Sequence, residues 1–133
     1  MIMLKIIYPV KRIVILLIAI LASCHGPIKI DYESAAGKIV ERCIENSNIY
    51  YVISFIPTHF SSKIYGQRIT INDKIFDNTV ITDFDLSNQF EDSSKVYYFS
   101  FYVVKETPIT CISSDTNIIT KKIDVKECVP IIK

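Results

Sequence analysis

A short apolar run near the start of the chain decides how much of the sequence is left to form a folded domain. Residues 13–22 read IVILLIAILA, and three cations precede them, at Lys5, Lys11 and Arg12. Ten apolar residues are half of the ~20 that a membrane-spanning helix needs, but they suit the central segment of a secretory signal peptide. We therefore predict that residues 1–23 are an export signal and that the fold is built from the residues after it.

The end of this run resembles the lipobox of bacterial prolipoproteins. That motif has an aliphatic residue, two small residues and a cysteine, and the chain has Leu21-Ala22-Ser23-Cys24 at this place. The resemblance implies cleavage between Ser23 and Cys24 by signal peptidase II and attachment of a diacylglycerol to the Cys24 sulfur. Acylation of the new amine as well would give a stable membrane anchor. The implied location is the bacterial cell envelope, facing the periplasm, and His25 in place of Asp favours the outer membrane.

Two alternatives to lipidation stay open at this point. An ordinary signal peptidase also accepts small residues here, and its product would be a secreted domain without lipid. A leader that is not cleaved would remain as a membrane anchor. In the lipoprotein interpretation residues 24–30 are a tether, and residues 25–30 reach at most ~20 Å when extended. The domain would then stay close to the bilayer.

The charge balance and the low glycine content exclude several kinds of partner. The 133 residues contain 15 Lys and Arg against 14 Asp and Glu, half of them are hydrophobic, and only three are glycine. Such a chain is not disordered, and without a basic cluster it is not typical of a nucleic-acid-binding protein. We therefore expect one globular domain over residues 31–133 that does not bind nucleic acid.

The segment 31–46 has its apolar residues at helical spacing. They recur at i, i+3 and i+4, at Tyr32, Ala35, Ala36, Ile39, Val40, Cys43 and Ile44. This pattern predicts an amphipathic helix, with Asp31 as its N-cap and the cluster 46–48 as its end.

From residue 49 onward the pattern is typical of strands. Two β-branched and aromatic runs, 49–56 (IYYVISFI) and 95–105 (KVYYFSFYVVK), are apolar enough to be central strands. Asn72-Asp73 and residues 114–117 indicate hairpin turns, and short turns imply antiparallel neighbours. We therefore predict an α+β domain, one N-terminal helix on an antiparallel sheet of five to six strands, similar in outline to cystatin-like folds.

The four cysteines bear on both the fold and the disulfides. Cys43 and Cys111 are 68 residues apart, which suits the alternative fold, an all-β immunoglobulin-like sandwich, although the chain has no tryptophan for its core. If Cys24 carries lipid, three cysteines remain, enough for one disulfide in an oxidising compartment. We expect Cys111–Cys128, the nearest pair in sequence, and keep Cys43–Cys128 and no disulfide as alternatives.

No group of residues in the sequence combines a nucleophile, a base and an orienting side chain. His25 falls in the tether, His59 stands by itself, and the chain has no Cys-x-x-Cys spacing. We therefore predict no catalytic residues, no cofactor and no metal site.

Tyrosines in the run 95–105 are the candidate binding surface. Strand alternation places Tyr98 and Tyr102 on one face and Tyr97 on the other, and their hydroxyls need partners. The leading hypothesis is a small, non-catalytic envelope lipoprotein that binds another envelope protein through a sheet surface or edge. A periplasmic inhibitor or immunity-type protein and a secreted, disulfide-containing binding domain are the alternatives.

Overall fold

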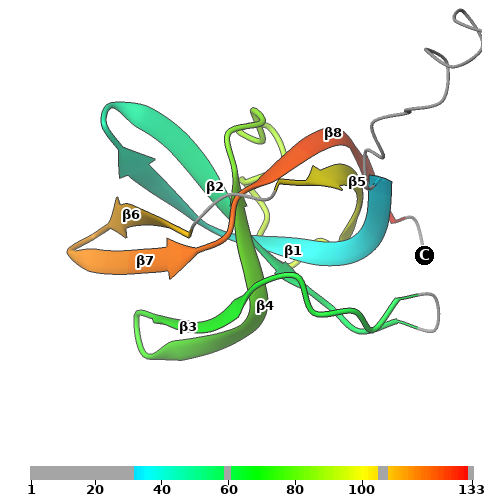
Figure 1. The fold of residues 1–133 in the computed structure, drawn as a ribbon, viewed down its shortest axis with the longest axis horizontal. Coiled ribbons are helices and arrows are strands. Elements are labelled where there is room, and N and C mark those ends of the chain that lie inside the picture. Colours follow the sequence, from blue (N-terminus) through cyan, green and yellow to red (C-terminus); the bar gives the residue numbers. More distant parts are fainter. Residues whose placement is uncertain (1–31, 59–60, 105–107, 132–133) are drawn as a thin grey trace, which may run out of the picture.

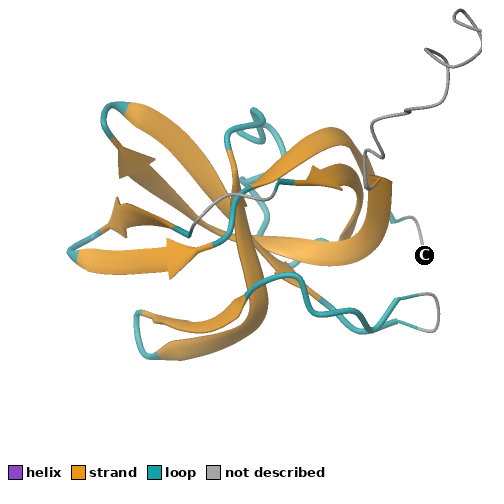
Figure 2. Cartoon of the chain, in the orientation of Figure 1, coloured by secondary structure: helices purple, strands orange, loops and turns teal. Residues whose placement is uncertain are grey.

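The computed structural model describes residues 32–58, 61–104 and 108–131, and the regular elements in these ranges are all β-strands (Figure 2). The strands are β1 (Tyr32–Glu45), β2 (Asn48–Phe55), β3 (Gln67–Ile71), β4 (Lys74–Thr82), β5 (Tyr97–Val103), β6 (Ile109–Ser113), β7 (Thr116–Thr120) and β8 (Ile123–Pro130). They form one sheet in the order β3-β4-β2-β1-β5-β8, and β6 joins it by pairing with both β1 and β7 (Figure 1).

The strand β1 occupies the residues for which the sequence predicted a helix, so the α+β prediction is wrong and the described part of the chain is all-β. A bulge at Val40 shifts the register of β1 against β2 between Ile39 and Glu41. β1 also contributes side chains to two separate cores. Residues that are consecutive in the sequence, such as Ile39 and Val40, are therefore both apolar. Pairs of apolar residues about four positions apart have the same spacing as a helical stripe, which explains the error.

The curled sheet closes on itself near the start of β8. Ile81 on β4 forms an isolated bridge with Lys122, and its N–H donates to the Lys121 carbonyl at 2.9 Å. The Thr120 hydroxyl donates to the Thr79 carbonyl beside this bridge. The described strands thus make one sheet, whereas the alternative prediction, an immunoglobulin-like sandwich, has two packed sheets.

Two hydrophobic cores lie on opposite faces of β2, because alternate residues of a strand point to opposite sides. The first core is the larger one and contains Ala35, Ile39, Tyr51, Ile53, Phe55, Tyr65, Val80, Leu86, Tyr97, Phe99, Phe101, Ile123 and Val125. The second core contains Cys43, Tyr50, Val52, Ile71, Ile81, Cys111 and Ile118. β2 therefore has to be apolar on both faces, and Val52 and Ile53 are both fully buried.

The predictions for the two apolar runs and the first hairpin are confirmed. β2 lies between β4 and β1, and β5 lies between β1 and β8. The turn at Asn72-Asp73 joins β3 to β4. The second hairpin is tighter than expected, because Ser114 and Asp115 alone form the turn, with positive φ values of 43° and 68°. Type I′ turns of this kind match the twist of paired strands.

The long strand β1 runs from one end of the molecule to the other. Its start lies on the right of Figure 1, near the segment that joins β2 to β3. Its end lies on the left, where the β1–β2, β3–β4 and β6–β7 turns gather. We call the first the tether end, because the chain enters β1 there, and the second the distal end.

Candidate binding surfaces

Several of the predicted site residues fall outside the part of the chain that the structure describes. These are Ser23 and Cys24, the predicted cleavage and lipidation sites. The two histidines, His25 and His59, for which no catalytic or metal-binding role was predicted, also lie outside the described residues. The lipobox interpretation therefore stays a prediction.

The disulfide joins Cys43 to Cys111, with the two Cα atoms 5.5 Å apart. The expectation of a disulfide is confirmed, but the expected pairing of Cys111 with Cys128 is wrong. Cys111 and Cys43 are both buried in the second core, whereas Cys128 lies on β8 opposite Phe99, beside the first core. The sheet therefore separates Cys128 from the cysteine that sequence distance favoured.

Cys128 is a free thiol in the structure. It is half-buried, and this burial raises the pKa of its thiol to about 11. A thiol with so high a pKa is protonated at neutral pH and is a poor nucleophile. Cys128 thus behaves as a small apolar side chain against the first core.

The three tyrosines of the predicted binding surface do not stay together. Tyr97 is only 5% exposed, belongs to the first core and donates its hydroxyl to the Gln89 carbonyl at 3.3 Å, so it is not a surface residue. Tyr98, which is 43% exposed, and the half-buried Tyr102 lie on the outer face of β5. Only two of the three predicted residues can therefore contact a partner.

Four isoleucines form an exposed row at the distal end, and we call this row the isoleucine face: Ile44, Ile49, Ile112 and Ile119. Ile44 on β1 stands opposite Ile49 on β2 and opposite Ile112 on β6. Ile119 on β7 lies diagonally across from Ile112, because it pairs with Thr110, which is two residues before Ile112 on β6. Directly opposed residues have Cβ atoms only ~4.5–5.5 Å apart, so the row is continuous across neighbouring strands. Each isoleucine is between 48% and 54% exposed.

A shallow depression of about 250 Å³ lies beside this row and includes an arginine. Its lining is Glu41, Arg42, Ile44, Phe90, Ile112, Ser113 and Ser114. Arg42 is exposed and forms no ion pair with another residue in the described ranges. An arginine beside exposed apolar side chains, here Ile44 and Ile112, is typical of the residues that contribute most to protein–protein binding.

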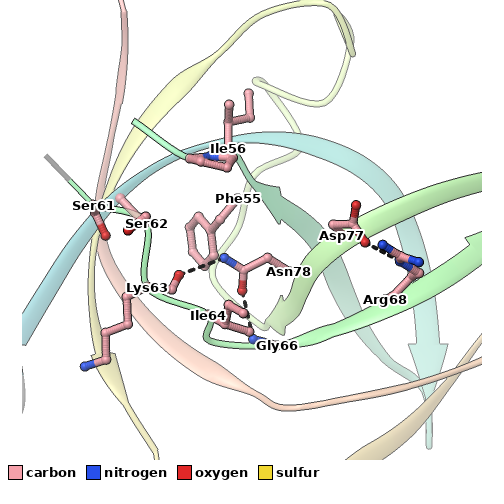
Figure 3. A pocket seen from close by; sticks show the side chains of 12 residues that line it. Phe55, Ile56, Ser61, Ser62, Lys63, Ile64, Gly66, Arg68, Asp77 and Asn78 are labelled. Carbon is pink, nitrogen blue, oxygen red and sulfur yellow. Dashed lines mark hydrogen bonds and ion pairs between the residues drawn. The ribbon is translucent and has the colours of Figure 1, made fainter. Parts of the chain in front are cut away.

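A larger pocket, of about 480 Å³, lies at the tether end between the end of β2, the segment 61–66 and the β3–β4 hairpin (Figure 3). The apolar part of its lining is Ala35, Phe55, Ile56, Pro57 and Ile64. Arg68 at its rim is already paired with Asp77. The pocket therefore offers mainly apolar walls.

One asparagine holds the segment that forms the wall of this pocket (Figure 3). Asn78 has a positive φ of 52° within β4, and its Oδ1 accepts the N–H groups of Tyr65 at 2.6 Å and Gly66 at 3.0 Å. Its Nδ2 donates to the Lys63 carbonyl at 2.9 Å. A Cβ atom on Gly66 would lie 1.6 Å from the Thr79 carbonyl oxygen, so only glycine fits there. The pocket wall is thus fixed by specific bonds.

A carboxylate at the start of β1 binds the same segment. Glu33 accepts a hydrogen bond from the Lys63 ammonium at 2.5 Å and another from the Tyr65 hydroxyl at 2.9 Å. The Lys63 bond is the larger cause, and the Tyr65 bond the next, of a Glu33 pKa below its ordinary value. Burial and the bond to Glu33 raise the pKa of the Tyr65 hydroxyl. The start of β1 and the pocket wall are therefore coupled.

Neither the isoleucine face nor the pocket was predicted from the sequence. A signal for the face was present, because Ile44 and Ile49 lie at equal distances from Asn46-Ser47, two residues of types that favour turns. The pairing of Ile44 with Ile112 needed the register of β6 on β1, which no local pattern carries.

Comparisons with known proteins identify no relative: no family model matches the chain, nor does any curated protein or solved structure. Within the described ranges no three His, Cys, Asp or Glu side chains are grouped so that they could hold a metal ion. The same residues include no helix that is long and apolar enough to cross a membrane.

Proposed function

We propose that this chain is a non-catalytic, lipid-anchored envelope protein that binds a protein partner through the isoleucine face. Two features of the sequence support export and anchoring: the apolar run 13–22 and the lipobox-like Leu21-Ala22-Ser23-Cys24 that ends it. The buried Cys43–Cys111 disulfide agrees with an oxidising compartment outside the cytoplasm.

The isoleucine face is the observation that carries the binding proposal. Four half-exposed isoleucines lie in one row on four neighbouring strands, whereas isolated exposed apolar side chains are ordinary. The row lies at the distal end, away from the point where the tether enters β1 (Figure 1). A 14-residue strand separates its two ends by at most ~43 Å, so the face can lie up to that distance from the point where the tether enters β1.

The residues of the face define the chemistry of the partner. Apolar side chains of the partner would cover Ile44 and Ile112, and a carboxylate would pair with Arg42 in the depression beside them. A guanidinium and a carboxylate form two parallel hydrogen bonds, which fix the orientation of the partner. We therefore expect a partner surface that is apolar with an acidic group beside the apolar part.

In-cell photo-crosslinking tests this function. A benzophenone amino acid at position 112 should give a defined adduct with an envelope protein, and Arg42→Glu in the same chain should reduce that adduct at least tenfold, the size expected for loss of about 1.4 kcal/mol. The matched control is the same amino acid at Val129, which is 44% exposed but lies on β8.

The outcomes separate the proposal from unspecific contact. An adduct from position 112 that is absent from position 129 and sensitive to Arg42→Glu supports the face. The same adduct from both positions, an adduct unaffected by Arg42→Glu, or no adduct at position 112 would contradict it.

A further inference from the structure

The tether end carries a second group of exposed apolar and cationic side chains, which we call the tether-end cluster: Tyr32, Ile64, Tyr102, Lys63 and Lys126. Tyr32, the first described residue of β1, is 53% exposed, and its ring meets that of Tyr102 edge-on at 5.3 Å. Ile64 is 78% exposed, more than any other large apolar side chain in the described ranges. Ile64 follows Lys63, which binds Glu33 next to Tyr32, so these groups share one end of the domain.

Each of the two lysines lies beside a tyrosine ring at this end: Lys126 beside Tyr102 of the cluster, and Lys63 beside Tyr65 of the first core. The Lys126 ammonium lies 5.6 Å from the centre of the Tyr102 ring, and the Lys63 ammonium lies 5.4 Å from the centre of the Tyr65 ring. Tyrosines concentrate at the boundary between bilayer and water, and lysines there bury their hydrocarbon stems while the ammonium stays hydrated. The cluster therefore has the composition of a membrane-interface surface.

The length of chain before β1 limits what can cover this surface. With lipid on Cys24, residues 25–31 are all that separate the anchor from Tyr32, and seven extended residues span at most ~25 Å. The bilayer that holds the lipid is therefore always within reach of the cluster. The short tether also prevents the domain from moving away from this large apolar phase.

We propose that the tether-end cluster docks on the bilayer that carries the lipid anchor, with Tyr32, Ile64 and Tyr102 in the headgroup region. This inference rests on the lipid anchor of the proposed function and adds a fixed orientation to it. The domain then stands on its tether end, and the isoleucine face is turned away from the membrane. A flexible tether alone would leave the direction of that face undetermined.

Uncharged lipid is sufficient for this docking. The export signal contains three of the 15 Lys and Arg residues and none of the 14 Asp and Glu, which leaves 12 against 14, a net charge of −2, after cleavage. Attraction to anionic lipid therefore contributes little overall, and the apolar groups carry the contact. Phosphatidylcholine vesicles are accordingly the right probe.

Hydroxyl-radical footprinting of the full lipidated protein in phosphatidylcholine vesicles tests the orientation. Tyr32 and Ile64 should be oxidised at least threefold more slowly than in the chain 24–133 with Cys24→Ser, which has neither leader nor lipid, mixed with the same vesicles. Ile44 and Ile112 are the internal controls, since they are 50% and 54% exposed at the distal end and should not change.

Mass spectrometry of the same sample separates the two levels of the proposal. A lipid mass on Cys24 with unprotected Tyr32 and Ile64 overturns the docking and leaves the anchor standing. No lipid mass on Cys24 overturns the anchor, and the docking with it.

A lengthened tether distinguishes docking from mere closeness. Inserting 20 Gly and Ser residues between Gly26 and Pro27 gives a flexible tether that no longer holds the domain at the surface. Protection of Tyr102 should persist in this chain and should be lost when Tyr32→Ser and Ile64→Ser are added. Loss of protection on lengthening alone would show that closeness was the cause, and would overturn the docking.

Discussion

The two cores are stabilised in different ways. The first core has 13 buried residues, and its aromatic rings interlock, with Phe55 stacked on Phe101 at 5.2 Å and Tyr65 edge-on to Phe101 at 5.0 Å. The second core has seven buried residues, two of which are the disulfide cysteines. The first core is stabilised by the burial of its side chains, whereas the second is stabilised by burial and by a covalent bond.

This difference matters for the isoleucine face. The hairpin of β6 and β7 carries Ile112 and Ile119, yet β6 meets β1 in a single register pair, Ile44 with Ile112. The Cys43–Cys111 disulfide lies directly beside that pair and fixes it. The end of the molecule with the smaller core therefore keeps its binding surface in register by means of the disulfide.

Removing the disulfide should produce the largest effect. Replacing Cys43 and Cys111 with alanine should lower the free energy of unfolding by about 2–5 kcal/mol, because the bond closes a loop between residues 68 apart in sequence. Hydrogen exchange should accelerate first in β6 and β7, and photo-crosslinking from position 112 should fall with it.

The matched control is Cys128→Ala, which removes a thiol but no bond. This substitution should lower the free energy of unfolding by about 1 kcal/mol or less, as is usual when a side chain loses a single atom. Equal acceleration of exchange in β5 and in β6 after loss of the disulfide would show that the two cores do not differ in the way described.

A smaller effect is expected at the tether end from the pH dependence of stability. The pKa of Glu33 is lowered in the folded chain, chiefly by the Lys63 hydrogen bond, so its carboxylate stabilises the fold fully above the unfolded value of about 4.3. That contribution is lost as the pH falls through the lowered pKa. Glu33→Gln should therefore lower the free energy of unfolding by less than about 1 kcal/mol at pH 7, because Lys63 is largely exposed. Once Glu33 is protonated, the substitution should not change the free energy of unfolding.

Urea unfolding of both chains at several pH values checks this. The difference in the free energy of unfolding between wild type and Glu33→Gln should disappear on acidification. A difference that is constant between pH 7 and pH 3 would assign the effect of Glu33 to packing and not to its charge.

The sequence was sufficient for the strands whose neighbours are close in the chain. The turn at Asn72-Asp73 and the apolar runs of β2 and β5 follow from local composition and alternation. β1 could not be recognised in this way, since Ala35-Ala36-Gly37 has low strand propensity and is overruled by its pairing with β2 and β5. The close approach of β2 favours glycine at position 37, because a Cβ there would lie 2.9 Å from the Ser54 carbonyl oxygen.

The candidate surfaces depend on contacts that are distant in sequence. Alternation correctly separated Tyr97 from Tyr98 and Tyr102, but it gave no information on which face was buried. The disulfide pairing depended on the same kind of long-range information, since Cys43 reaches Cys111 only through β1 and β6. Local patterns thus predicted which residues share a face and left open what each face packs against.

Metabolic labelling with a fatty-acid analogue tests most directly that the domain is anchored at its tether end. Wild type, Cys24→Ser and Cys128→Ser are compared, because Cys128 is the one described cysteine outside the disulfide. If Cys24 carries the lipid, wild type and Cys128→Ser should be fully labelled and Cys24→Ser should carry no label. Label that survives in Cys24→Ser, or that never appears in wild type, would contradict it.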